Sequence, residues 1–149
     1  MDIKYMELAL LEAKKAYQED EIPVGCIIVK DDVILAKAHN IKEKKNSVLG
    51  HAEIECIKKA CKKINNWNLS GCDLYVTLEP CLMCTGAIVN ARIDNVYFSS
   101  RSEKGGSLVS SLNIKDVKKL NHYPKIHEGL LSEQTSALLK DYFKTKREK

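Results

Sequence analysis

The sequence predicts an α/β fold built on a mixed sheet. A strand-like run at 74–78 is followed by a helical pattern at 81–90 and by a second strand-like run at 95–98. A strand, a helix and a strand in this order form a βαβ unit, in which the two strands are parallel. Two apolar runs at 24–29 and 33–36, separated by a short polar turn, are typical of a β-hairpin.

Amphipathic helices are predicted at both ends of the chain. The first should end near Glu19, and its apolar residues recur at intervals of three or four. These residues are Met6, Leu10, Ala13 and Tyr17. The second has Ser132 as its expected N-cap and ends in a basic segment. The basic residues are Lys144, Lys146, Arg147 and Lys149.

The segments between these helices are shorter. We expect a lysine-rich loop up to Gly50, a helix over 51–65, a polar loop over 99–107, a short helix over 114–120 and an edge strand at Ile126. The chain shows no internal repeat, low-complexity tract or domain boundary. Residues 1–149 are therefore expected to form a single domain.

Composition narrows the possible classes of protein. The net charge of +4 permits a nucleic-acid partner without requiring one. No apolar run approaches membrane-spanning length, and residues 1–21 do not form a secretory apolar core. Two of the six cysteines belong to a metal-binding pattern, and the other four are expected to be buried or half-buried free thiols. We therefore expect a reducing, cytoplasmic compartment and no membrane association.

Two short motifs predict a zinc site. Cys81 and Cys84 follow Pro80 and lie three residues apart on the first turn of a helix, where the helix dipole favours thiolates. His51, at the start of another predicted helix, can supply a third ligand. Zinc prefers four ligands, so a water can occupy the fourth position, as in a catalytic site. The alternative is a structural zinc, whose fourth ligand would come from the set His39, Cys72 and His122.

Glu53 indicates the kind of catalysis. A carboxylate beside zinc-bound water is suited to carry protons, although taken alone it is an ordinary first-turn Glu favoured by the helix dipole. The pattern H-x-E followed by P-C-x-x-C is the signature of zinc nucleobase deaminases. Glu79 is interpreted as a residue that positions backbone rather than as a second base. Taken alone, Asn40 is a turn residue at the end of a strand.

With these motifs placed, nearly the whole chain resembles the bacterial tRNA adenosine deaminases of the cytidine-deaminase-like fold. The matching segments are EIPVG at 21–25, HAEI at 51–54, LYVTLEPC at 74–81, NH at 121–122 and LLKDYF at 138–143. The zinc signature alone fits any zinc base or nucleoside deaminase. The tRNA assignment depends on the last two segments.

The resemblance implies a three-layer α/β/α fold with a central mixed sheet of about five strands. It implies a homodimer with one zinc per subunit that converts the wobble adenosine of a tRNA anticodon stem-loop to inosine. His51, Cys81 and Cys84 would hold zinc, and Glu53 would transfer protons. The implied substrate contacts are Asn40, Arg101, Ser102, Lys104, Tyr142, Phe143 and Arg147.

The chain departs from the family pattern near the substrate. It has Val48, Leu49 and Gly50 where Pro-Thr-Ala is common, and Ser102 where an acidic residue often contacts the nucleotide. Two alternative functions therefore stay open. One is a zinc deaminase of a free base or nucleoside such as guanine, cytosine or cytidine, and the other is a non-catalytic zinc-binding RNA module.

Overall fold

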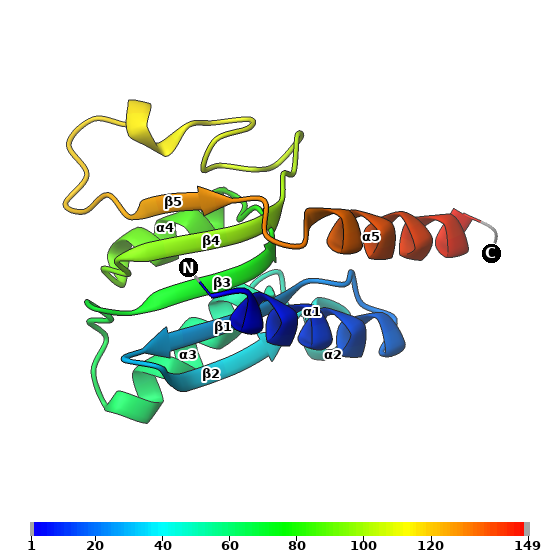
Figure 1. Ribbon diagram of the computed structural model, residues 1–149, viewed down its shortest axis with the longest axis horizontal. Coiled ribbons are helices and arrows are strands. Elements are labelled where there is room, and N and C mark those ends of the chain that lie inside the picture. Colours follow the sequence, from blue (N-terminus) through cyan, green and yellow to red (C-terminus); the bar gives the residue numbers. More distant parts are fainter. Residues whose placement is uncertain (1, 148–149) are drawn as a thin grey trace.

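The computed structural model describes residues 2–147 and contains a five-stranded sheet of order β2-β1-β3-β4-β5 (Figure 1). The strands are β1 (Gly25–Lys30), β2 (Val33–His39), β3 (Asp73–Leu78), β4 (Asn95–Ser100) and β5 (Lys125–Glu128). The helices are α1 (Ile3–Gln18), α2 (Lys42–Lys45), α3 (Ala52–Ile64), α4 (Leu82–Asn90), the 3-10 helix η1 (Ile114–Asp116) and α5 (Ser132–Arg147).

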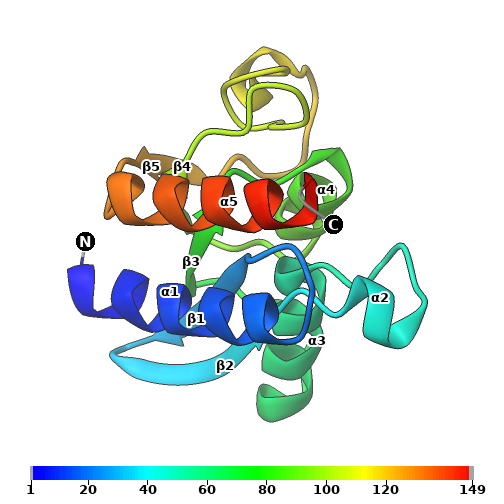
Figure 2. The ribbon, with the colours of Figure 1, turned by 90° about the vertical axis from the view of Figure 1, so that its right-hand side faces the viewer.

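Both faces of the sheet are covered by helices, which confirms the predicted three-layer fold. Side chains of a strand alternate between its two faces. On β1, Cys26 and Ile28 therefore belong to the core beneath α3 and α4, whereas Ile27 and Val29 belong to the core beneath α1. α1 and α5 lie side by side, as both ribbon views show (Figure 1 and Figure 2). Tyr17 of α1 packs edge-on against Tyr142 of α5.

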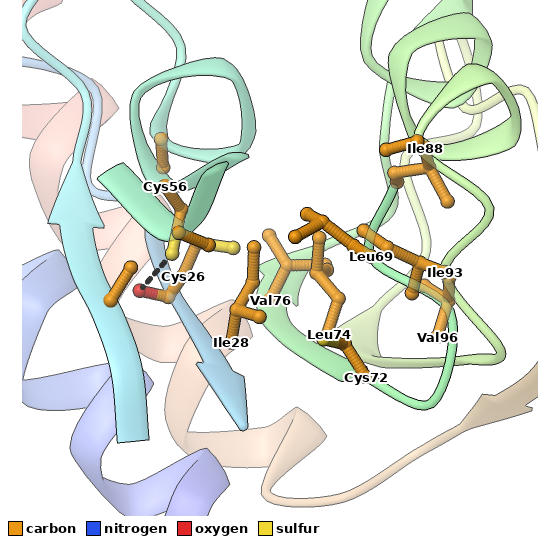
Figure 3. Packing of buried hydrophobic residues seen from close by; sticks show 14 of the residues in the cluster. Cys26, Ile28, Cys56, Leu69, Cys72, Leu74, Val76, Ile88, Ile93 and Val96 are labelled. Carbon is orange, nitrogen blue, oxygen red and sulfur yellow. Dashed lines mark hydrogen bonds between the residues drawn. The ribbon is translucent and has the colours of Figure 1, made fainter. Parts of the chain in front are cut away.

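The larger core joins α3 and α4 to the sheet. Its side chains include Leu74 and Val76 of β3 and Ile88 of α4, all fully buried (Figure 3). The Cys56 thiol of α3 donates to the Cys26 carbonyl at 3.4 Å, which fastens α3 to β1 (Figure 3). All six cysteines lie within the described residues, and none of them forms a disulfide. The four outside the metal-binding pattern are buried or half-buried free thiols, as the sequence predicted.

The strand directions bring two helix starts to one edge of the sheet. β1 is antiparallel to both β2 and β3, so β2 and β3 point the same way. α3 follows β2, through the short helix α2, and α4 follows β3 directly. Both helices therefore begin at the edge where β2 and β3 end, which is the usual place for a ligand site in an α/β sheet.

Several predicted boundaries need correction. The lysine-rich loop contains a one-turn helix, α2, and the short helix predicted over 114–120 is reduced to the 3-10 turn η1. α4 begins one residue later than predicted, because Cys81 is its N-cap and Leu82 is its first residue. Ser132 is the first residue of α5 rather than its N-cap.

His127, in β5, is half-buried. Its ring stacks on Tyr97 with centroids 4.4 Å apart, and its Nε2 lies 3.0 Å from Oδ1 of Asn95. The edge strand predicted at Ile126 is confirmed as β5, which is parallel to β4. Lys149, part of the predicted basic end, lies outside the described residues. Among residues 2–147, none of the helices combines the length and apolar character needed to cross a bilayer.

We expect Gly25→Ala to destabilise the protein by about 2 kcal/mol or more, because overpacking forces the backbone to move. A Cβ at Gly25 would lie 1.9 Å from the Ala9 carbonyl oxygen and 2.6 Å from the Ala13 nitrogen of α1. Gly86→Ala is the matched control, since nothing lies within 4 Å of its added Cβ in α4. That change should stabilise the helix by about 0.5–1 kcal/mol. Urea unfolding of both variants measures the difference, and equal stabilities would contradict this packing.

Candidate active site

Three predicted zinc ligands meet where α3 and α4 begin. His51 is the N-cap of α3 and Cys81 is the N-cap of α4, and neither side chain makes a capping hydrogen bond. Cys84 is the third residue of α4. Both cap side chains are therefore free to turn toward a common point, and both helix N-termini direct their partial positive charge toward it.

The distances fit a tetrahedral zinc ion. Nδ1 of His51 lies 3.7 Å from Sγ of Cys81 and 3.5 Å from Sγ of Cys84. Zn–S and Zn–N bonds of about 2.3 and 2.05 Å at the tetrahedral angle place nitrogen and sulfur ligands about 3.5 Å apart. All three ligand atoms lie within 4.8 Å of one another. The site therefore matches zinc both in geometry and in ligand type.

The two thiols hold a proton between them until a metal binds. Hydrogen bonds from the Cys84 thiol and then from His51 lower the pKa of Cys81 to about 4, against the effect of burial. The hydrogen bond to Cys81 and burial raise the pKa of Cys84. A dication displaces such a proton, so metal affinity at this site should fall as the pH falls.

The alternative fourth ligands do not reach this cluster. His39 is bonded to Glu12 at 3.0 Å and to Glu19 at 3.1 Å. Nε2 of His122 lies 2.6 Å from the Ile93 carbonyl, and Cys72 is part of the larger core. Within residues 2–147 the metal-binding cluster has three members, which leaves a fourth position for water and favours the catalytic interpretation.

Glu53 is buried beside the cluster without belonging to it. Only 4% of the residue is exposed, and it lines the same cavity as His51 and Cys81. Burial raises the pKa of Glu53 to about 7, a shift to which the nearby Cys81 thiolate adds. A carboxyl group with this pKa can both take up and release a proton near neutral pH, which is the property of a general acid–base catalyst.

The cavity above these residues has a volume of about 310 Å³. Ligand pockets range from about 300 to 1,000 Å³, so a single small molecule or one base of a larger ligand suits it. The lining residues are Glu21, Ile22, Val24, Asn40, Lys42, Glu43, His51, Glu53, Leu78, Glu79, Cys81, Ser102, Gly105 and Tyr142.

The predicted substrate contacts divide into two groups. Asn40, Ser102 and Tyr142 line the cavity. Phe143 lines a neighbouring hollow of about 840 Å³, which shares Tyr142 with the first. The remaining three, Arg101, Lys104 and Arg147, are exposed and line neither space.

Some of these residues also have structural partners. Oδ1 of Asn40 accepts the Ala52 N–H at 2.8 Å and so caps the start of α3. Tyr142 is only 7% exposed and donates its hydroxyl to the Asp20 carbonyl at 3.2 Å. The Arg101 guanidinium is paired with Glu128 at 2.8 and 3.1 Å.

Sequence reasoning missed Glu21 and Lys42 as cavity residues. Each lies in a loop or short helix whose position depends on distant contacts. Glu21 begins the matching segment EIPVG, but no role in the cavity followed from that segment. Glu79 was interpreted as a positioning residue, and the structure agrees. Although burial opposes it, hydrogen bonds from Ser110, Val109 and Ser102 lower the pKa of its carboxyl.

Comparison with known proteins identifies a matching protein family and relatives of similar sequence. Residues 1–100 match the family model described as the cytidine and deoxycytidylate deaminase zinc-binding region. The tRNA-specific adenosine deaminase of Aquifex aeolicus is 47% identical over 143 residues, which cover 96% of this chain and 94% of that protein. The enzyme of the same name from Bacillus subtilis is 39% identical over 148 residues, covering 99% and 92%.

Solved structures agree with the sequence relatives. A structure from a study of A-to-I editing by tRNA:A34 deaminases at the wobble position of transfer RNA superposes with a TM-score of 0.90 at 38% identity. The superposition covers 93% of this chain and 100% of the chain in that structure. A guanine deaminase from Bacillus subtilis superposes with a TM-score of 0.64 at 27% identity, covering 98% and 93%.

We expect Glu53→Gln to stabilise the zinc-free protein at high pH. A raised pKa in the folded state means that ionising Glu53 opposes folding, and this cost grows as the pH rises from about 4.5 to about 7. Above pH 7 the variant should gain on the order of 3 kcal/mol, and below pH 4.5 the gain should vanish. Urea unfolding with a chelator at pH 8 and pH 4.5 tests this, and a pH-independent difference would contradict it.

Proposed function

The chain belongs to the zinc-binding deaminase family that includes the tRNA-specific adenosine deaminases, and from this membership we propose that residues 1–149 form one catalytic domain that deaminates adenosine to inosine at the wobble position of a tRNA anticodon. The observation that carries the proposal is the buried carboxyl of Glu53 beside a three-ligand zinc site at the base of a cavity. The relatives of matching name cover almost the whole chain, which favours this substrate over a free base.

Glu53 provides the proton transfers of the reaction. When bound by His51, Cys81 and Cys84, zinc supplies a Lewis acid that makes water more nucleophilic. Glu53 accepts a proton as the water oxygen bonds to C6 of adenine, and gives that proton to N1. It then takes the proton of the new hydroxyl group and delivers it to the amino nitrogen. The C6–N bond breaks, ammonia leaves and inosine remains.

Asn40 orients the base. Its Oδ1 is occupied by the Ala52 N–H, which fixes the amide plane and turns Nδ2 away from α3. Because Asn40 also lines the cavity, Nδ2 can donate to an acceptor nitrogen of the purine. A base held in this way must leave its stack, so the substrate is a single-stranded or loop nucleotide.

The neighbouring hollow suits the nucleotides that flank the target base. Phe143 is 42% exposed there and can stack on a base. Lys44 and Lys146 line the hollow together with the acidic residues Glu19, Asp20, Glu21 and Glu43. Lys146 also pairs with Asp20, so its charge is partly engaged. Arg147 extends the basic surface along α5. Tyr142 is buried, so it contributes to this surface mainly by packing and not by stacking on a base.

The proposal includes three further features that follow from family membership. One zinc ion binds per subunit, the protein acts as a homodimer, and it works in the cytoplasm, where its free cysteines stay reduced. Light scattering that gives the mass of a dimer, rather than the 16.8 kDa of one chain, would support the assembly.

The direct test is mass spectrometry of nucleosides after the protein is incubated with an anticodon stem-loop that carries a wobble adenosine. Wild type should convert that adenosine to inosine. Glu53→Ala should keep its zinc and lose about 10² to 10⁴ in rate, the usual contribution of one general acid–base group. Turnover of free guanine, cytosine or cytidine with none on the RNA would support the alternative deaminase, and no turnover at all would support a zinc-binding RNA module.

RNA recognition by α5 can be tested separately. Phe143→Ala with Arg147→Ala should raise the KM for the stem-loop tenfold or more, because a stacked base alone is worth about 1–3 kcal/mol. The loss of a phosphate contact from Arg147 adds to this effect. The double variant Lys62→Ala, Lys63→Ala is the matched control, since both lysines are exposed at the far end of α3. Equal KM values for the two double variants would contradict the assignment of this surface.

A further inference from the structure

We infer that Glu79 is a positioning residue, whose buried carboxylate holds the loop between β4 and η1 against the active-site cavity. This loop, residues 101–113, is called here the β4–η1 loop. Its Ser102 and Gly105 line the cavity, as does Glu79 itself. The inference rests on the proposed function, because part of its consequence is measured on deamination.

The carboxylate of Glu79 gathers hydrogen-bond donors from across the loop. Oε2 accepts the N–H groups of three consecutive residues, Leu108 at 3.2 Å, Val109 at 2.9 Å and Ser110 at 3.0 Å. Oε1 accepts the Ser102 N–H at 3.2 Å and the Ser110 hydroxyl. Successive N–H groups that converge on one point form an anion-binding nest, and here the anion is part of the protein.

The backbone of the β4–η1 loop packs directly against the Glu79 carboxylate. A Cβ at Gly106 would lie 2.3 Å from Cδ of Glu79 and 2.5 Å from the Ser102 carbonyl oxygen, so only glycine fits there. The Gly106 N–H donates to that same carbonyl at 2.7 Å. The Ser107 N–H donates to the Pro80 carbonyl at 2.9 Å, which adds a second tie to the metal-binding segment.

The chemistry of the site requires a carboxylate. Every partner of Glu79 is a donor, and a glutamine would present an NH₂ group to some of them. Glu79 is 3% exposed, so an unsatisfied donor there could not turn to water. Because Glu79 lies two residues before Cys81, the same short segment fixes both the metal and the cavity wall. Loss of this anchor lowers the fraction of molecules whose loop is ready to bind substrate, and the apparent affinity falls by that fraction.

A second wall of the cavity is held in the same manner. Glu21 is 2% exposed, and its carboxylate accepts the N–H groups of Glu43 at 3.1 Å and Lys44 at 2.8 Å. The backbone of Gly50 also packs closely against α2, since a Cβ at Gly50 would lie 2.7 Å from the Lys42 Cα. Two buried carboxylates that accept backbone N–H groups thus shape a cavity whose walls have little regular secondary structure.

The test compares Glu79→Gln with Glu12→Gln on stem-loop deamination. Glu12 is a matched control because it is 6% exposed, bonds to Lys15 and His39, and does not line the cavity. We expect Glu79→Gln to keep its zinc and to raise KM about tenfold or more, with kcat changed less than threefold. Glu12→Gln should lower stability and leave KM unchanged. A KM for Glu79→Gln within twofold of an active wild type would overturn the inference.

Hydrogen exchange of the wild-type protein provides a test that is independent of deamination and of variant folding. The amides of Leu108, Val109 and Ser110 should exchange at least about 100-fold more slowly than unprotected amides, since their hydrogens are bonded to a buried carboxylate. Exchange at the unprotected rate would overturn the inference, even if no RNA were deaminated. Gly106→Ala should raise KM as Glu79→Gln does, because it displaces the loop without changing the carboxylate.

Discussion

The active site depends on two helices that begin at the same edge of the sheet. β1 lies between β2 and β3 and runs against both, so the segments that leave β2 and β3 emerge together and lead into α3 and α4. His51 and Cys81 cap these helices, and Cys84 lies one turn into the second. The partial positive charge of both N-termini favours thiolates at the one point where three zinc ligands can meet.

This arrangement requires negative charge to be buried in several places. Glu53, Glu79 and Glu21 are each less than 5% exposed. The three carboxyl groups differ in how the cost of their burial is offset. Glu79 and Glu21 are compensated by backbone N–H groups, so their carboxylates hold the cavity walls. For Glu53, burial outweighs a hydrogen bond from its own backbone N–H, and its pKa rises to about 7. Burial of the Glu53 carboxyl lowers the stability of the folded protein, and the reaction uses the protonation of this same group, as expected for a catalytic residue.

Local patterns in the sequence were sufficient to predict the order of the main helices and strands along the chain, the free thiols and the cluster of three potential zinc ligands. They succeeded because continuous apolar runs such as that of β1 and the spacing of Cys81 and Cys84 are short-range signals. They failed for α2 and for the β4–η1 loop, whose conformations depend on carboxylates far away in the sequence. They also gave no sign that Tyr142 packs against Tyr17, because this contact requires α1 and α5 to be adjacent. Exposure of an aromatic side chain follows from tertiary contacts, which no local pattern specifies.

The central claim is that zinc is held by three protein ligands, with the fourth position open beside Glu53. X-ray absorption at the zinc edge tests it most directly on the purified protein. The account predicts two sulfur ligands at about 2.3 Å and two lighter ligands at about 2.0–2.1 Å, one being nitrogen of His51 and the other oxygen of water. A third sulfur, or a second histidine in place of the water, would mean a closed structural site and would contradict the account.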